Sequence, residues 1–303
     1  MATTKKTKIC YRDRLTGKIT AERIFAEDLL RWLYEDTLGF TVFNCFLNNQ
    51  AFCWLFGKLQ DLPSSRRKIF EFVKEYSINL EEVEFPLEYY QNFNAFFSRH
   101  LKSHARPFIK NADIFCSPGD GKVLVYPKLT KQTQIPVKGS AITVEALLAS
   151  ESAAQTYQDG SALILRLAPR DYHRFHFPDQ GKANRARYIR GTYHSVNPIA
   201  LSRVPGILYQ NKRAVTEFYS QNFGRITYVE IGATTVASII QTYTPGIVDR
   251  GQEKGYFQYG GSTIVLLFEP GAIIFDEDLI QDSQQHLEVQ VQAGNQLGTK
   301  ISH

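Results

Sequence analysis

The chain has 303 residues, a net charge of +5 and 43% hydrophobic residues, a composition typical of a globular protein with a sizeable core. The length allows one large or two ordinary domains. Four cysteines without a CxxC pair argue against a disulfide framework or a cysteine-based zinc site and favour a reducing compartment. The polar start, MATTKKTKICYRDR, lacks the apolar core of a signal peptide.

The first hundred residues are predicted to be mainly helical. Residues 22–36 place Phe25, Leu29, Trp32 and Leu33 at helical spacing, which predicts an amphipathic helix. Residues 65–76 and 86–101 are predicted to form further helices.

Residues 37–57 carry no charge and are long enough to span a bilayer. Polar side chains interrupt this stretch, and such groups are costly in hydrocarbon. They are Asn44, Asn48, Asn49 and Gln50. We therefore expect two short aromatic-rich helices, which either lie in a membrane interface or pack on the protein.

From about residue 115 the pattern changes to short β-rich runs between turn residues. These runs are 163–167, 226–231, 235–240, 263–268 and 287–291. The predicted fold class is α+β, with a helical N-terminal region (1–110) packed on a mostly antiparallel β domain (111–303).

The basic charge is concentrated between residues 180 and 216, which hold seven Lys or Arg and no Asp or Glu. Such a stretch suits phosphate or an anionic membrane surface, although a solvated face is an equally ordinary explanation. The seven are Lys182, Arg185, Arg187, Arg190, Arg203, Lys212 and Arg213.

The run YFQYGGSTIVLLFE (256–269) places two glycines and a serine before a buried-strand pattern. Gly260, Gly261 and Ser262 could form an ordinary tight turn. A serine held in a strained turn after glycine could instead attack the carbonyl group that precedes it. The local sequence leaves both interpretations open.

The segment LAPRDYHRFHFP (167–178) holds His173 and His176 in what the flanking strand pattern and prolines indicate is an extended stretch. Residues three apart in such a stretch point to opposite faces, so the two histidines are expected to have separate duties, unless both are structural. No third ligand has suitable spacing, so no metal site is predicted. Asp120, in SPGDGKV, is either a turn residue or the group that orients a histidine base towards Ser262.

Together these motifs resemble the phosphatidylserine decarboxylases, which are self-processing pyruvoyl enzymes. The similar motifs, in the family's order over roughly residues 90–270, are FFSRHLKSHARP, SPGDGKV, LAPRDYHRFHFP, HSVNPIA, NKRAV, YVEIGATTVASI and GQEKGYFQYGGSTIVLLFE. Two positions depart from the family pattern: Lys212 stands where an acid is usual, and Ala237 replaces a common glycine.

The resemblance implies that the chain cuts itself between Gly261 and Ser262. The Ser262 hydroxyl would attack the Gly261 carbonyl, with His176 as base and Asp120 orienting it. Elimination and hydrolysis would leave a covalent pyruvoyl group (the pyruvate cofactor) on a small chain, with a large chain ending at Gly261.

The pyruvoyl group would then form a Schiff base with the amine of phosphatidylserine. Loss of carbon dioxide gives phosphatidylethanolamine once a proton returns to the substrate carbon, and His173 is the implied donor. The expected activity is thus that of a carboxy-lyase in phospholipid biosynthesis.

Expected partners are phosphatidylserine, an anionic membrane surface and a second copy of the chain, but no nucleic acid. The expected location is peripheral, at the cytoplasmic face of the cell membrane. Three alternatives remain open: a soluble pyruvoyl decarboxylase of a free amino acid, a Ser-His-Asp hydrolase with Ser262 intact, and a lipid-binding module without activity.

Overall fold

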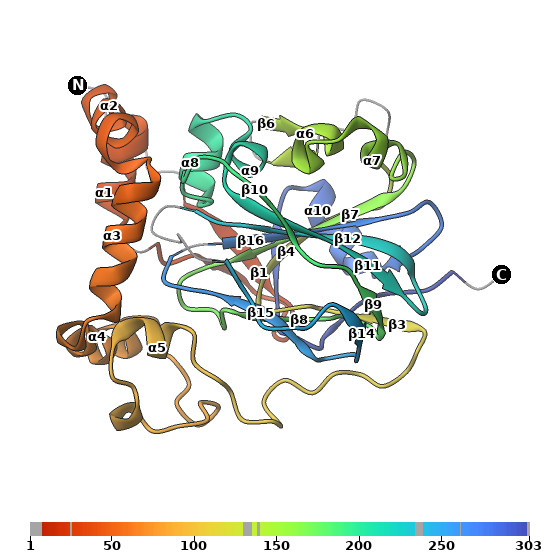
Figure 1. Cartoon of the computed structure of the whole chain (residues 1–303), viewed down its shortest axis with the longest axis horizontal. Helices are drawn as coiled ribbons and strands as arrows, with labels where there is room; N and C mark the ends of the chain where they lie inside the picture. Colours follow the sequence, from red (N-terminus) through yellow and green to blue (C-terminus); the bar gives the residue numbers. More distant parts are fainter. Residues whose placement is uncertain are drawn as a thin grey trace.

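The computed structural model of the chain describes residues 8–24, 26–129, 135–137, 140–233, 239–260 and 262–301. Figure 1 shows a large sheet in the middle, helices α6, α7 and α9 above it, smaller sheets below it and a layer of helices at one end. The predicted α+β class, with a mostly antiparallel sheet, is confirmed.

The main sheet has eleven strands in the order β14-β9-β11-β12-β16-β7-β4-β18-β1-β2, with β10 pairing to β11. Neighbours are antiparallel except β1 and β18, which are parallel. Their bounds are β1 Cys10–Asp13, β2 Ile19–Ala21, β4 Gly121–Tyr126, β7 Ser161–Leu167, β9 Gly181–Ala183, β10 Arg187–Ile189, β11 Arg213–Ser220, β12 Gly224–Ile231, β14 Gly246–Val248, β16 Ser262–Phe268 and β18 Glu288–Val291.

Strands β16 and β7 lie at the centre of this sheet, and every residue in both is buried. A strand covered on both faces needs apolar side chains on both, which explains the unbroken apolar run TIVLLF. Ile264, Leu266 and Phe268 join the core on one face, and Val265 and Leu267 join the core on the other. The strand that begins at Ser262 is therefore held rigidly from all sides.

Smaller elements cover the two faces of the main sheet. On one face lie a sheet of β13 Ile239–Gln241, β15 Glu253–Phe257 and β8 Arg174–His176, a sheet of β17 Ile274–Phe275, β19 Gln296–Thr299 and β3 Ile114–Cys116, and helix α10 Glu277–Gln284. The other face is packed by α6 Val144–Leu148, α7 Glu151–Gln155, α8 Pro198–Arg203 and α9 Ile207–Gln210. A separate pair joins β5 Ile135–Val137 to β6 Ser140–Ile142.

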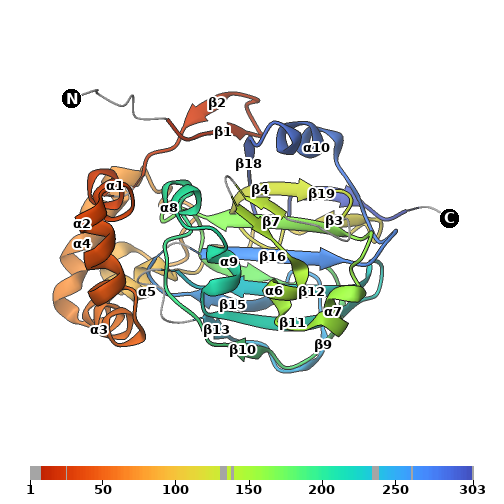
Figure 2. The same cartoon turned by 90° about the horizontal axis from the view of Figure 1, so that it is seen from above.

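The N-terminal helices form the layer at the end of the sheet (Figures 1 and 2). They are α1 Glu27–Glu35, α2 Thr37–Val42, the π-helical turn Phe43–Leu47, α3 Gln50–Asp61, a 3-10 turn Pro63–Arg66, α4 Arg67–Tyr76, a 3-10 turn Leu87–Tyr89 and α5 Phe93–Phe97. Within the described ranges, every helix is too short or too polar to cross a bilayer.

The prediction of two short helices in residues 37–57 is confirmed, with a π-helical turn between them. Asn49 caps α3 because its side chain accepts a hydrogen bond from the Phe52 amide. Asn48 accepts from the amide of Tyr193, so part of the polar interruption attaches the layer to the β domain.

Two helix predictions have wrong bounds. The helix predicted for 22–36 begins only at Glu27, because residues 19–21 pair with β1 and Glu22 enters a buried ion pair. Phe25 lies outside the described residues. The helix predicted for 86–101 is limited to Phe93–Phe97 and a 3-10 turn.

The strand predictions are confirmed where the structure describes them, but of the run 235–240 only residues 239 and 240 are described. The N-terminal region also contributes β1 and β2 to the main sheet, which periodicity did not indicate.

Candidate active site

Ser262 is the first residue of β16, where it pairs with Leu167 at the end of β7. Its side chain is fully buried, and its hydroxyl has no hydrogen-bond partner among the described residues. Gly260, two residues before it, has φ of 136°, a conformation that favours glycine. The unusual backbone expected of the turn is thus present at Gly260, whereas Gly261 lies outside the described residues.

His173 lies at the same corner of the sheet as Ser262. Its Nε2 is 3.1 Å from the carbonyl oxygen of Ala168, the residue that follows Leu167. Its ring is fully buried and stacks on Phe97, with 4.0 Å between ring centroids. Burial lowers the pKa of His173 to about 3, so the ring is neutral near pH 7.

His176 lies farther along, in β8, where it pairs with Glu253 at the start of β15. Its Nδ1 is 3.0 Å from the Gly251 carbonyl oxygen, and its Nε2 is buried without a partner among the described residues. Burial lowers the pKa of this imidazole as well. The two histidines therefore contact different groups, while their separate duties stay a prediction.

Asp120 pairs with Arg106 and not with a histidine. Its carboxylate accepts three hydrogen bonds from the guanidinium of Arg106, at 2.7 to 3.0 Å, and one from the Ala293 amide. Burial raises the pKa of Asp120, and Arg106 acts against that rise. The expected hydrogen bond from His176 to Asp120 is not formed, so Asp120 influences that ring only through its charge.

A buried network of charges supports this corner of the molecule, and the sequence motifs did not reveal it. Arg166 binds Glu22 at 2.7 Å and Glu288 at 2.6 Å, while Lys122 lies 3.3 Å from Glu22 and 3.5 Å from Asp171. The clue in the sequence was Arg166 inside the apolar strand LILRL. A charge in a buried strand requires a buried partner.

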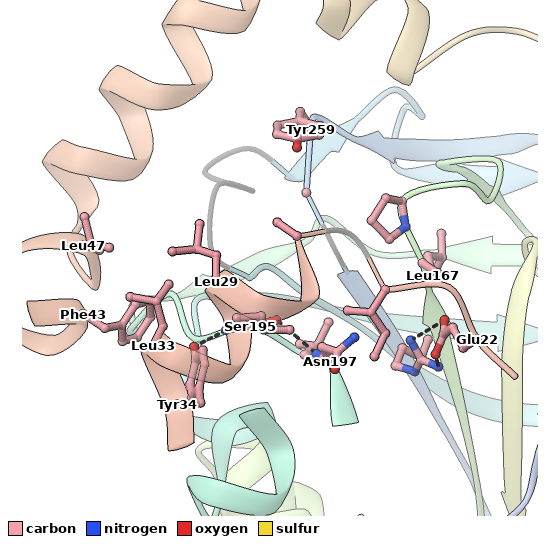
Figure 3. Close-up of a pocket in the computed structure, with 18 of the residues that line it drawn as sticks. Glu22, Leu29, Leu33, Tyr34, Phe43, Leu47, Leu167, Ser195, Asn197 and Tyr259 are labelled. Atoms are coloured by element: carbon pink, nitrogen blue, oxygen red, sulfur yellow. Dashed lines mark hydrogen bonds and ion pairs between the residues drawn. The ribbon is translucent and has the colours of Figure 1, made fainter. Parts of the chain in front are cut away.

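An apolar cavity of about 270 Å³ lies between the helix layer and the corner of the main sheet where β7 ends and the turn before β16 begins (Figure 3). Leu29, Leu33, Phe43 and Leu47 line it from the helices, as Figure 3 shows. On the opposite side it reaches the turn before Ser262 through Tyr259 and Gly260, and the end of β7 through Leu167, Ala168 and Pro169.

Tyr259 belongs to the turn that leads to Ser262, and its ring contacts those of Phe93 and Phe97, with centroids 5.0 and 5.2 Å away. Its amide donates to Asn94. The turn is thus attached to α5, whose Phe97 also stacks on His173. The arrangement combines a desolvated hydroxyl, a neutral imidazole and an apolar cavity, which suits chemistry on an amphiphilic substrate.

The chain is similar in sequence to known proteins over most of its length. The sequence model of the phosphatidylserine decarboxylase family matches residues 93–299. A phosphatidylserine decarboxylase proenzyme of Clostridium novyi is 41% identical over 281 residues, which cover 92% of this chain and 95% of the relative.

Two further relatives carry the same name. The one from Clostridium botulinum (strain Langeland) is 39% identical over 96% of this chain and 99% of its own length. The one from Chlamydia trachomatis serovar L2 is 41% identical over 97% of this chain and 98% of its own. The chain belongs to the phosphatidylserine decarboxylase family.

Proposed function

We propose that the chain is a proenzyme that cuts itself between Gly261 and Ser262 and then converts phosphatidylserine to phosphatidylethanolamine and carbon dioxide. One observation carries the proposal: Ser262 follows the glycine turn and presents a buried hydroxyl that has no partner among the described residues, in a chain of this family. Leaving a polar group buried without a partner costs stability, so such a group needs an explanation.

The reaction begins with the chain's own residues. The Ser262 hydroxyl attacks the Gly261 carbonyl carbon, and the acyl group moves from the Ser262 nitrogen to its oxygen to form an ester. Elimination then releases the large chain with a Gly261 carboxylate and leaves dehydroalanine at position 262, and hydrolysis of the dehydroalanine releases ammonia and leaves the covalent pyruvoyl group. That group supplies an electrophilic carbonyl and an electron sink, which no protein side chain provides. The site suits it, because the buried oxygen of Ser262 and the buried Nδ1 of His173 both lack partners among the described residues.

We assign self-cleavage to His176, with Asp120 supporting it, and the return of a proton to the substrate to His173. The position of His173 supports the second role, since its ring contacts the carbonyl of the residue next to Ser262's strand partner. Asp120 supports His176 through negative charge, because its hydrogen bonds go to Arg106 and Ala293.

A diacyl phospholipid fits the site better than a free amino acid does. The cavity is lined mainly by apolar side chains and leads from the helix layer to the turn before Ser262, so it suits the apolar part of a lipid whose amine reaches the cut end. A free polar amino acid would leave that lining without a function.

We propose that the helix layer binds the membrane at its surface. Leu38, Phe46, Trp54 and Phe70 each expose more than half of their side chains, which is unusual for apolar residues so close together in sequence. The basic stretch does not form one continuous face: Arg213 is buried, and β9, which carries Lys182, lies far from the helices in Figures 1 and 2. Electrostatic attraction to anionic lipid is therefore a secondary contribution in this proposal, at the cytoplasmic face of the cell membrane.

The test is denaturing mass spectrometry of the purified chain, combined with a carbon dioxide assay on vesicles of phosphatidylserine and on free serine. Two chains of 261 and 42 residues (303 minus 261) are expected, with a carbonyl group on the small one and activity on the lipid. Full activity on free serine would favour the soluble alternative, and one intact active chain would exclude the pyruvoyl mechanism. Size-exclusion chromatography of the purified protein under native conditions tests the expectation that two copies of the chain form a homodimer.

A further inference from the structure

We propose that Asp171 is a positioning residue that fixes the tautomer of His173, so that Nδ1 is the nitrogen that takes up and delivers the proton. The inference rests on the proposed function and adds to it a residue and an atom. It concerns the short segment between β7 and β8, which carries Ala168, Asp171 and His173.

Asp171 and Ala168 hold each other by two hydrogen bonds. The Ala168 amide donates to the Asp171 carboxylate at 2.7 Å, and the Asp171 amide donates to the Ala168 carbonyl at 2.9 Å. This closed turn fixes the direction in which the Ala168 carbonyl oxygen points. The same oxygen is 3.1 Å from Nε2 of His173.

A carbonyl oxygen can only accept a hydrogen bond, so Nε2 of His173 must donate to it. In a neutral ring the other nitrogen, Nδ1, then carries the lone pair. That atom is buried and has no partner among the described residues. Stacking on Phe97 opposes rotation of the ring, so Nδ1 remains the free position.

Asp171 is itself held in place from several sides. Its side chain is only 4% exposed, and Lys122 lies 3.5 Å away, with Arg170 at 3.8 Å. Lys122 in turn contacts Glu22, which binds Arg166. The carboxylate is thus paired and buried, which is the condition for a charge to act as a rigid anchor.

This geometry lets one atom serve two proton transfers. The substrate ammonium must lose a proton before its nitrogen can attack, and the carbon that loses carbon dioxide must gain one. Nδ1 can accept the first proton and supply the second, and the ring then returns to the tautomer in which it began. The substrate's carboxylate and phosphate favour the protonated ring while the substrate is bound.

The first experiment is ¹⁵N NMR of the histidine-labelled protein, which distinguishes the two neutral tautomers without any turnover. The His173 signal, assigned from its absence in His173→Gln, is expected to report hydrogen on Nε2 at pH 7. Asp171→Ala should yield a mixture of tautomers, whereas Asp171→Asn, which keeps an acceptor for the Ala168 amide, should retain the wild-type form. Hydrogen on Nδ1 in the wild type would overturn the proposal.

The second experiment is a double-mutant cycle. Asp171→Ala should still be cut but lose about 10- to 100-fold in kcat, the range found when a group that orients a metal-bound histidine is removed. The same substitution in a His173→Ala background should cause no further loss, because Asp171 acts through that ring. An equal loss in both backgrounds would overturn the positioning role.

These two experiments distinguish a failure of the role of Asp171 from a failure of the proposed function. If the wild type is neither cut nor active, the proposed function fails, while the tautomer measurement still decides the role of Asp171. If Asp171→Ala does not fold, the cycle is made with Asp171→Asn, for which a loss of less than about tenfold and a retained tautomer are expected. A shifted tautomer in that variant would contradict the proposal.

Discussion

The helix layer and the corner around Ser262 use aromatic and charged residues in opposite ways. In the layer, Phe46 is 67% exposed and Trp54 is 58% exposed. At the corner, the aromatic ring of His173 is fully buried, and even Lys122 and Arg166 are almost completely buried. The chain thus exposes apolar surface where a lipid would be met and removes water where proton transfers would take place.

The difference shows what each region requires. Several large apolar side chains exposed in one region indicate a surface that binds a partner or a membrane. Buried charges are tolerated only when fully paired, and the network of Glu22, Lys122 and Arg166 meets that condition. Variants in the two regions should therefore fail in different ways.

Ser262→Ala removes the nucleophile from the corner and should abolish both cutting and decarboxylation. The chain should run as one band of 34.6 kDa on a denaturing gel, with unchanged vesicle binding. Ser161→Ala is the matched control, since Ser161 is a buried serine at the other end of the same strand pair. If Ser262→Ala were still cut, or Ser161→Ala were not, the cleavage site would be wrongly placed.

His173→Ala should be cut normally and then decarboxylate about 10²–10⁴-fold more slowly, the usual range for losing a general acid or base. His176→Ala should remain mostly one chain, and Asp120→Ala should be cut incompletely. The measurements are a denaturing gel and a carbon dioxide assay, with His286→Ala, a change at an exposed histidine just after α10, as the control. The reverse pattern for the two histidines would exchange their roles.

Glu22→Gln tests the buried charges of the corner. Arg166 and Lys122 overcome the effect of burial and lower the pKa of Glu22 from 4.5 to about 2. A carboxyl whose pKa is depressed on folding stabilises the protein fully above its unfolded value, and that contribution is lost as the pH falls from 4.5 towards 2. The shift corresponds to a loss of free energy of unfolding on the order of 3 kcal/mol at pH 7.

Urea unfolding at pH 7, 4 and 3 measures this effect. The difference between wild type and Glu22→Gln should narrow as the pH falls, whereas Glu151→Gln, a change at an exposed carboxyl, should match wild type throughout. A difference that does not depend on pH would mean that the Glu22 charge contributes little.

Trp54→Ser tests the exposed region and should have the smallest effect. If the Trp54 side chain is buried in the lipid surface, its loss should cost about 1.5–3 kcal/mol of binding free energy. The affinity for vesicles should then fall about tenfold or more. Cutting should be unaffected. Ile247→Ser is the control, because Ile247 is 80% exposed on β14, at the other end of the molecule. Equal losses for both variants would show that the helices are not the anchor.

Much of this arrangement was predictable from local sequence. Unbroken apolar runs identified β7 and β16, and the family motifs identified Ser262, His173 and His176 together. The chain's family membership, inferred from those motifs, is confirmed by the comparisons. The catalytic roles of these residues remain predictions.

The rest depends on contacts between residues far apart in the chain. Glu22 meets Arg166 across 144 positions, and Arg12 meets Asp282 across 270, so no local period contains either pair. Asp120 illustrates the same limit: its turn was recognised, but Arg106 binds it because the preceding loop folds back onto it. Local patterns report which groups are buried, whereas tertiary packing decides which partners they find.

The placement of β16 has a consequence for the protein after a cut at residue 262. The released piece would carry β16, β17, α10, β18 and β19, which pair with β7, β12, β4, β1 and β3 of the remainder. The two pieces would stay together through strand pairing in two sheets, although no covalent bond joins them. Refolding would then become a meeting of two molecules that depends on concentration, whereas the uncut chain refolds alone. Maturation would therefore be a one-way step for folding as well as for chemistry.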